Sequence, residues 1–396
     1  MSYNPMGIGR IGFAAQTTYG TAITSGFTAL ECEAVLPPIG REIFTRENIV
    51  KQGHYVLNPI DGSQHGSGDL TITMPLHGYG TAAALTPSAH AEALFLESIL
   101  GGLHTAPRTS ADITDAGTSI ATINLDSGGD ISRFTAGEAR AITNAAGVIN
   151  ATFLTGVNVT DMDIGPSSES LHSDGGDILS SLNCLLTNDV TPTFFTFEWR
   201  SLQNSSRLLI EGCVPTSCEL TLDAKAQPTI AFTFTVNSIA ASADTALADI
   251  AYTQSALGAA MGANAARMVR GSTEIAVSGF SITIAQTLAG ALDHNAGQGI
   301  GALISTGRTI TATFTELLTA APSVVTAGAS TDRLFLQLGS SAAGIVCVLM
   351  PSPVLTEVGE LSDQDGVIGQ TRTYQPGNDS ADGTGSGDPD PSDTDF

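Results

Sequence analysis

Two stretches that lie far apart in the chain share one alternating pattern, and this pattern decides the fold class. They are Gly68-Asp-Leu-Thr-Ile-Thr-Met-Pro-Leu76 and Gly307-Arg-Thr-Ile-Thr-Ala-Thr-Phe-Thr315. In both, apolar side chains at even positions alternate with threonines at odd positions. A β-strand points successive side chains to opposite faces, so each stretch predicts a strand with one face toward a core and the other toward water.

The same alternation recurs along the chain and predicts a mainly β protein of the α+β type. One helix is expected to flank the strands, because Ser88 can cap its start, Leu96 and Ile99 mark an apolar face, and Gly101–Gly102 ends it. Ile345–Met350 is apolar on both faces and predicts a central strand. The predicted strands are Cys32–Leu36, Leu70–Leu76, Phe194–Trp199, Arg207–Gly212, Cys218–Leu222, Thr229–Val236, Phe280–Ile284, Thr309–Thr315, Leu334–Leu338 and Ile345–Met350.

Three segments depart from this pattern. The region of about residues 103–190 is polar and rich in Gly, Ser and Asp, and it predicts an insertion with small strands of its own. Residues 241–268 are alanine-rich and fit either a helix or a connector. Residues 377–396 are rich in Asp and nearly free of apolar side chains, which predicts a flexible acidic tail.

The charge of the chain is one-sided. In 396 residues, 39 acidic side chains face 15 basic ones, which gives a net charge of −24. Such a surface repels the phosphates of DNA, so tight nucleic-acid binding is not expected, although the same surface suits a wall that DNA slides past. The sequence shows neither a signal-peptide pattern at its start nor an apolar run long enough for a transmembrane helix.

No motif predicts catalysis, a cofactor or a metal site. Cys213 and Cys218 have no second ligand pair beside them. Gly297–Gly301 lacks the flanking strand and helix of a phosphate loop, and Asp363–Gly366 predicts a turn because it lacks further calcium ligands. The histidines, His77 included, are expected in loops or at the surface. The five cysteines are expected to be buried or free thiols, with a Cys213–Cys218 disulfide or a cross-link between subunits as alternatives.

The order of the predicted strands occurs twice, with few residue identities, and indicates a duplicated β domain. Gly68–Leu76 in the first unit then corresponds to Gly307–Thr315 in the second. The predicted division is a first domain over residues 1–265, which contains the insertion, a second over 266–376, and the tail over 377–396.

Four phrases follow one another in the chain: Ile11-Gly-Phe-Ala-Ala-Gln-Thr-Thr-Tyr-Gly-Thr-Ala22, Asp61-Gly-Ser-Gln-His-Gly-Ser-Gly-Asp-Leu-Thr-Ile-Thr-Met74, Leu94-Phe-Leu-Glu-Ser-Ile-Leu-Gly-Gly102 and Ile210-Glu-Gly-Cys-Val-Pro-Thr-Ser-Cys-Glu-Leu-Thr-Leu222. In this order they resemble the N-terminal signature, the Gly-rich loop before the inner strand, the flanking helix and the Gly-Cys segment of the phage tail tube proteins. Gln16 departs mildly from the family, in which an acidic residue is common there. The insertion and the acidic tail have no counterpart.

The resemblance implies a structural virion protein, the major tail protein of long-tailed bacteriophages. Its copies would polymerise into stacked rings that form the tail tube, the conduit for DNA ejection. It implies tandem β-sandwich domains, each with a long hairpin, and the hairpins would close an intersubunit β-barrel around the lumen. Two strands are expected to form this inner barrel. Their residues are Leu70, Thr71, Ile72, Thr73 and Met74 in the first, and Thr309, Ile310, Thr311, Thr313 and Phe314 in the second.

The partners follow from the same resemblance. Rings would be trimeric if the domain is duplicated and hexameric if it is not. Other tail proteins would bind the tube, DNA would pass without specific binding, and no membrane is involved. The expected location is the tail of the virion, after synthesis in the cytoplasm of the bacterial host.

Two other functions fit a β-rich chain less well. One is another virion component, such as a head decoration or baseplate-hub protein. The second is a polysaccharide-active enzyme, which would need paired carboxylates in a groove lined by exposed aromatic side chains. Aromatic residues make up 6% of this chain, which argues against the enzyme.

Overall fold

The structure of the chain is a computed structural model in which β-strands predominate. It describes residues 9–17, 19, 23–36, 43–44, 60–61, 68–77, 91–104, 111–114, 122–125, 139–143, 149–157, 162–165, 178–181, 184–187, 192–201, 206–223, 226–243, 266–271, 273–292, 300–318, 328–329, 334–341, 344–350, 353–364 and 366–376. Within these ranges, no helix has the length and apolarity that crossing a membrane requires. The predicted mainly β fold is confirmed.

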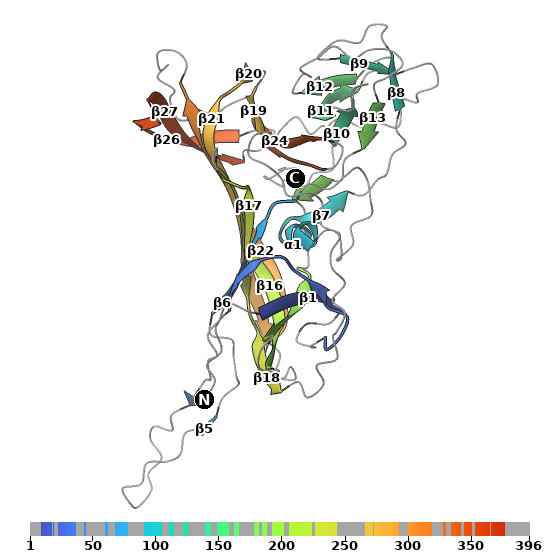
Figure 1. Cartoon of the computed structure of the whole chain (residues 1–396), viewed down its shortest axis with the longest axis vertical. Helices are drawn as coiled ribbons and strands as arrows, with labels where there is room; N and C mark the ends of the chain where they lie inside the picture. The colour runs from blue at the N-terminus through green and yellow to red at the C-terminus, as the bar shows by residue number, and fades with distance from the viewer. Residues whose placement is uncertain are drawn as a thin grey trace, which may run out of the picture.

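Thirteen strands form one branched antiparallel sheet (Figure 1), and the long strand β16 (Ser206–Asp223) belongs to both branches. The first half of β16 pairs with β15 and β18, whereas its second half pairs with β17 and β21. The first branch contains β2 (Thr28–Ala29), β1 (Gly9–Gln16), β15 (Phe194–Ser201), β16 and β18 (Ser238–Ala243). The second branch contains β3 (Glu33–Val35), β6 (Asp69–Pro75), β17 (Thr229–Thr235), β16, β21 (Val277–Leu292), β22 (Ile300–Leu317), β27 (Val367–Pro376), β26 (Pro353–Gln364) and β23 (Gly328–Ala329).

The change of partners along β16 takes place at Gly212. This residue has a φ of 61°, and a Cβ there would lie 2.6 Å from the Cβ of Asn237, so only glycine fits. Pro215 follows within a register shift opposite β17, where a residue without an N–H is tolerated. The sequence predicted two strands here, Arg207–Gly212 and Cys218–Leu222. Both ranges are strand, but the predicted break between them is wrong, because the irregularity redirects one continuous strand instead of ending it.

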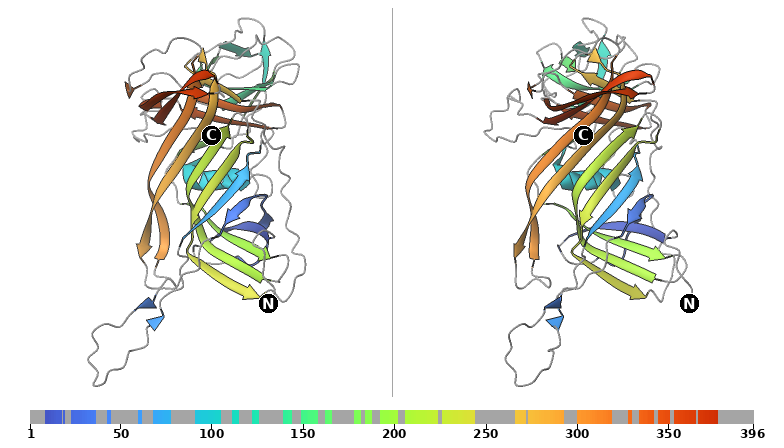
Figure 2. Two further views of the ribbon diagram at one scale, coloured as in Figure 1. Left: turned by 60° about the vertical axis from the view of Figure 1, so that its left-hand side comes forward. Right: turned by 90° about the vertical axis from the view of Figure 1, so that its left-hand side faces the viewer.

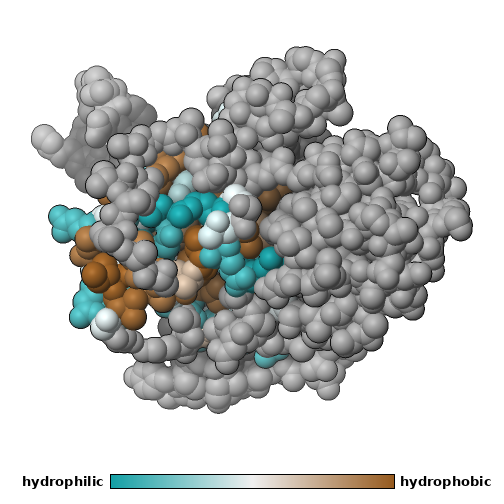
Figure 3. Space-filling model, turned by 90° about the horizontal axis from the view of Figure 1, so that it is seen from above, coloured by the Kyte–Doolittle hydropathy of each residue, from teal (hydrophilic) through white to brown (hydrophobic). Residues whose placement is uncertain are grey.

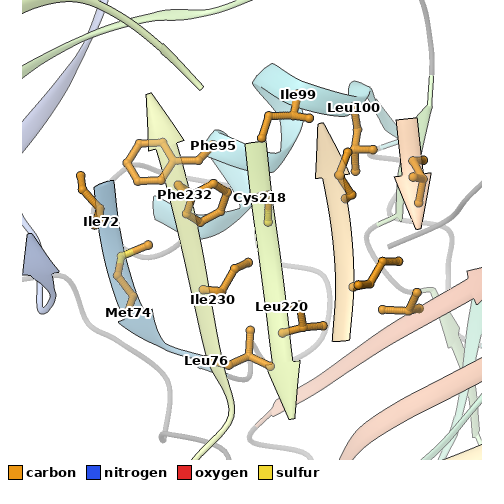
Figure 4. Close-up of a cluster of buried hydrophobic side chains, with 14 of the residues drawn as sticks. Ile72, Met74, Leu76, Phe95, Ile99, Leu100, Cys218, Leu220, Ile230 and Phe232 are labelled. Atoms are coloured by element: carbon orange, nitrogen blue, oxygen red, sulfur yellow. The ribbon is translucent and has the colours of Figure 1, made fainter. Parts of the chain in front are cut away.

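The helix α1 (Ala91–Leu100) packs across one face of the second branch, as Figure 4 shows with Phe95 beside Phe232. The ring of Phe95 lies 4.9 Å from that of Phe13, 5.1 Å from Phe195 and 5.3 Å from Phe232. Edge-to-face contacts of this kind stabilise a core beyond simple area burial. The aromatic cluster therefore joins the helix to both branches of the sheet.

His77, which was predicted in a loop or at the surface, lies after the end of β6 and is buried, so the surface alternative is wrong. Its Nδ1 lies 2.9 Å from Oε1 of Glu92, which is also buried, in the first turn of α1. A carboxylate at this end of a helix interacts favourably with the helix dipole. The second residue after β6 is thus tied to the helix, which strand alternation does not reveal.

A smaller sheet has the order β20 (Thr273–Glu274), β19 (Ala266–Arg270), β24 (Leu334–Ser341) and β25 (Gly344–Met350). The sequence predicted Ile345–Met350 as a central strand, but β25 lies at the edge of this four-stranded sheet. Val348 and Leu349, on opposite faces of β25, are both buried. The run is apolar because neighbouring elements cover both of its faces, and not because strands flank it on both sides.

The segment between residues 101 and 187 contains strands that pair among themselves. β7 (Gly101–His104) pairs with β14 (Cys184–Thr187). Between them, six strands form a closed barrel: β8 (Ala111–Thr114), β9 (Thr122–Leu125), β10 (Ala139–Thr143), β11 (Ile149–Val157), β12 (Met162–Gly165) and β13 (Ile178–Ser181). Figure 1 places this barrel near β24, beyond α1. A further short pair is β4 (Ile43–Phe44) with β5 (Ile60–Asp61).

Several sequence predictions fall on residues outside the described ranges. These are the acidic tail, residues 244–265 of the alanine-rich segment, positions 297–299 of the Gly-rich loop, and His54 and His65. The division into two duplicated domains stays a prediction. Across the predicted boundary at residue 265, β16 pairs directly with β21.

The aromatic cluster supplies a stability test. Phe95→Ala removes a ring that contacts both branches, and we expect it to lower the free energy of unfolding by about 3–5 kcal/mol. Chemical denaturation followed by circular dichroism measures this loss. Phe95→Leu keeps most of the apolar volume and should cost less than half as much. Equal stability of the Phe95→Ala variant and the wild type would contradict the central role given to this ring.

Candidate assembly surface

The second branch has two chemically different faces. Along β6, β17, β16, β21 and β22, every second side chain points toward α1 and the core, and these side chains are buried. They include Leu70, Ile72, Met74, Ile230, Phe232, Phe234, Cys218, Leu220, Phe280, Ile282, Ile284, Ile310, Ala312 and Phe314. Burial of this apolar face fixes which residues point the opposite way.

The opposite face is a continuous surface of small polar residues, which we call the threonine face. The strand register aligns it in rows that run across the five strands. One row is Thr71, Thr233, Ser217, Ala285 and Thr309, the next is Thr73, Ala231, Glu219, Thr283 and Thr311, and the third is Pro75, Thr229, Thr221, Ser281 and Thr313. These side chains are half-buried or exposed. The threonine face is therefore available for contact with water or a passing molecule.

The electrostatic character of the threonine face is neutral to acidic. Of the fifteen residues in the three rows, only Glu219 is charged, and it is exposed. None of these rows contains Lys or Arg. Since DNA phosphates are held mainly by cationic side chains, this face offers a duplex little to bind.

The structure places the ten predicted strand residues in one sheet, but on strands that are not neighbours. β6 and β22 are separated by β17, β16 and β21. Thr71, Thr73, Thr311 and Thr313 lie half-buried and Thr309 exposed on the threonine face, whereas the remaining five are buried beneath it. These five are Leu70, Ile72, Met74, Ile310 and Phe314. The sequence did not predict that the intervening strands β17, β16 and β21 belong to this surface, although Thr229–Val236 shows the same alternation.

The distal part of the β21–β22 hairpin separates from the strands beside it (Figure 2). β21 pairs with β16 only over residues 279–285, and β22 pairs with β27 only from Ala312 onward. In the described part of the chain, residues 286–292 of β21 and 300–311 of β22 therefore have a strand on one side only. Their outer backbone N–H and C=O groups form free edges, which can accept a further strand.

The opposite end of the second branch also has a free edge. β3 pairs with β6 through Val35 and Thr71, and the described residues include no strand on its other side. All three residues of β3 are exposed, and Val35 has 68% of its surface exposed. The threonine face is thus bordered by a free edge at β3 on one side and by the free edge of residues 300–311 of β22 on the other, whereas Thr313 is paired with Thr373 of β27.

An ionic cluster lies at the end of the β21–β22 hairpin where β22 pairs with β27. Arg270 on β19 donates to both carboxylate oxygens of Glu316 on β22, at 2.7 and 3.2 Å, and Nε of Arg372 on β27 lies 3.1 Å from the same carboxylate. Burial lowers the pKa of Arg270, but the hydrogen bonds and charges of Glu316 and Tyr374 raise it above its usual value. The cluster joins the four-stranded sheet to the second branch through charges that compensate one another.

A second ionic cluster and two thiols are buried in the described part of the chain. Glu198 is fully buried and paired with Arg200, at 2.7 Å, and with Arg207. Cys213 and Cys218 are separate free thiols, so the structure does not have the alternative disulfide between them. Burial raises the pKa of both thiols, which keeps them protonated at neutral pH. Within the described ranges, no group of three His, Cys, Asp or Glu residues is arranged to hold a metal ion.

Comparison with known protein families gives one clear result. A family whose description is phage tail tube protein matches residues 8–322. The matched range begins just before β1 and ends just after β22, so it covers most of the chain and both lateral ends of the threonine face. The hairpin of β26 and β27 lies beyond the match. A search of curated protein sequences found no match.

The ionic cluster leads to a second stability prediction. Glu316→Gln leaves Arg270 and Arg372 without a compensating charge, and we expect a loss of about 3–5 kcal/mol in the free energy of unfolding. Denaturant titration measures it. The matched control is Glu357→Gln on β26, an exposed carboxylate for which the change should stay within about 0.5 kcal/mol. If the two variants were equally stable, the cluster would not join the sheets as described.

Proposed function

Since the chain belongs to the phage tail tube protein family, we propose that its threonine face lines the lumen of the tube and that its free strand edges close the ring. The chain is a structural component of the virion tail. The observation that carries the proposal is the continuous threonine face, which a free strand edge borders on each side. A passage for DNA needs a hydrated wall with few cations, and the composition of this face meets that requirement.

Ring closure uses the two free edges. The outer edge of the β21–β22 hairpin in one copy pairs with the edge formed by β3 and β6 in its neighbour, so that the threonine faces join into one barrel. Strand addition of this kind satisfies backbone groups that are exposed in a single chain, and closing the barrel removes all free edges. The lumen then forms only when several copies come together.

The two proposed units of the chain determine the number of copies in a ring. If residues 1–265 and 266–376 are equivalent units, three chains make a ring of six units, and if they are not, six chains do. Other tail proteins cap or extend the tube, and DNA passes through it during ejection. We infer that no residue of this chain performs chemistry, which distinguishes it from the polysaccharide-active alternative.

A shortened hairpin tests the proposed ring closure. Replacing residues 288–306 with Asn-Gly joins Thr287 to Gly307, which pair with each other, through a two-residue turn. We expect a folded protein that forms neither rings nor tubes, because most of the free edge of the hairpin is lost. Negative-stain microscopy and light scattering measure assembly. Circular dichroism and the melting temperature show whether the monomer is intact, and a normal yield of tubes from this variant would refute the proposed pairing.

End-on images of assembled wild-type protein give the number of chains per ring. Three chains are expected if the two units are equivalent, and six chains would exclude the proposed duplication. Discrete caps or monomers in place of hollow tubes would favour a head decoration or baseplate-hub protein.

A further inference from the structure

The turn between β26 and β27 exposes apolar side chains in an unusual concentration. Leu361, Val367 and Ile368 are 50%, 43% and 52% exposed, and they account for three of the five large exposed hydrophobic residues in the described ranges. We call these three residues the hairpin tip. Figure 3 views this end of the molecule and shows apolar surface gathered among hydrophilic atoms. Leaving apolar side chains in water is unfavourable, so such a group marks a contact surface.

The hairpin tip is held in one conformation. Oδ1 of Asp363 accepts a hydrogen bond from the N–H of Gly366 at 2.6 Å, which closes the turn. The N–H of Leu318 donates to the carbonyl of Ile368 at 2.8 Å and attaches the tip to the end of β22. Because its conformation is already fixed, the tip loses little conformational entropy when it binds another surface.

The hairpin tip and the distal end of the β21–β22 hairpin lie at opposite ends of β22. Leu317 of β22 pairs with Gly369, next to the tip, whereas the distal end of the β21–β22 hairpin lies at the opposite end of the same strand. That distal end exposes another apolar residue, Ile304, at 54%. A tube grows by contact between two different surfaces on successive copies, and these two surfaces lie at opposite ends of the strand that lines the proposed lumen.

We propose that the hairpin tip of one copy contacts the distal end of the β21–β22 hairpin in a copy of the adjacent ring. This inference rests on the proposed function, because it assigns the contact between rings that the tube requires. The net charge of −24 makes copies repel one another. Burial of the apolar side chains at the junction between rings offsets this repulsion, to which the exposed Glu360 and Asp363 beside the tip also contribute.

The test is the double variant Val367→Thr, Ile368→Thr. Threonine keeps the β-branched shape and strand preference of both residues but removes their apolar ends. We expect rings to form and the critical protein concentration for tubes, measured by sedimentation, to rise at least about tenfold. Ile304→Thr should also raise the critical protein concentration for tubes. The matched control, Val367→Ile with Ile368→Val, keeps the apolar surface and should assemble like the wild type.

The outcomes separate this inference from the proposed function. Wild-type tubes with an unchanged critical concentration in the double variant would overturn the inference alone. Failure of the wild type to form rings or tubes would overturn both. If the melting temperature shows that the double variant is unfolded, Leu361→Thr on the other strand of the hairpin replaces it, with an expected rise of about threefold; no rise would overturn the inference.

Discussion

The burial of one face of the second branch against α1 is the constraint on which the rest of the structure depends. Side chains alternate along each strand, so a shift of one residue in register would bring threonines into the core and apolar side chains into water. Phe95 and Ile99 of α1 pack on the apolar face and select one register. The threonine face is a consequence of that choice. Its rows align across five strands because the opposite rows are packed.

This constraint also explains why the long strand β16 changes partners instead of ending. An unbranched sheet of all of these strands would extend far from the helix that covers it, and much of its apolar face would meet water. At Gly212 the chain turns, and the first branch folds so that Phe195 and Phe197 reach Phe95 from their own side. The ionic cluster around Glu316 joins the four-stranded sheet to the hairpin at the other end.

The sequence predicts the strands well because alternation is local. The pattern at Leu70–Met74 and at Ile310–Phe314 correctly indicates which residues are buried. It does not predict which strands are neighbours, since pairing depends on contacts between residues that are distant in the chain. For this reason the three strands between β6 and β22 were missed as parts of the same surface. The burial of His77 beside Glu92 was missed for the same reason.

The fold contains a closed barrel without free strand edges and a branched sheet with free strand edges, and this difference bears on function. The barrel of β8 to β13 closes on itself, so each of its strands has two neighbours and the barrel offers no edge to another chain. The second branch leaves β3 and the distal hairpin with one neighbour each among the described strands. Unpaired edges on long alternating strands promote uncontrolled association unless a defined partner covers them. Leaving them open is tolerable in a protein whose neighbours in the tube are copies of itself, because in the proposed ring each copy supplies the edge that another lacks.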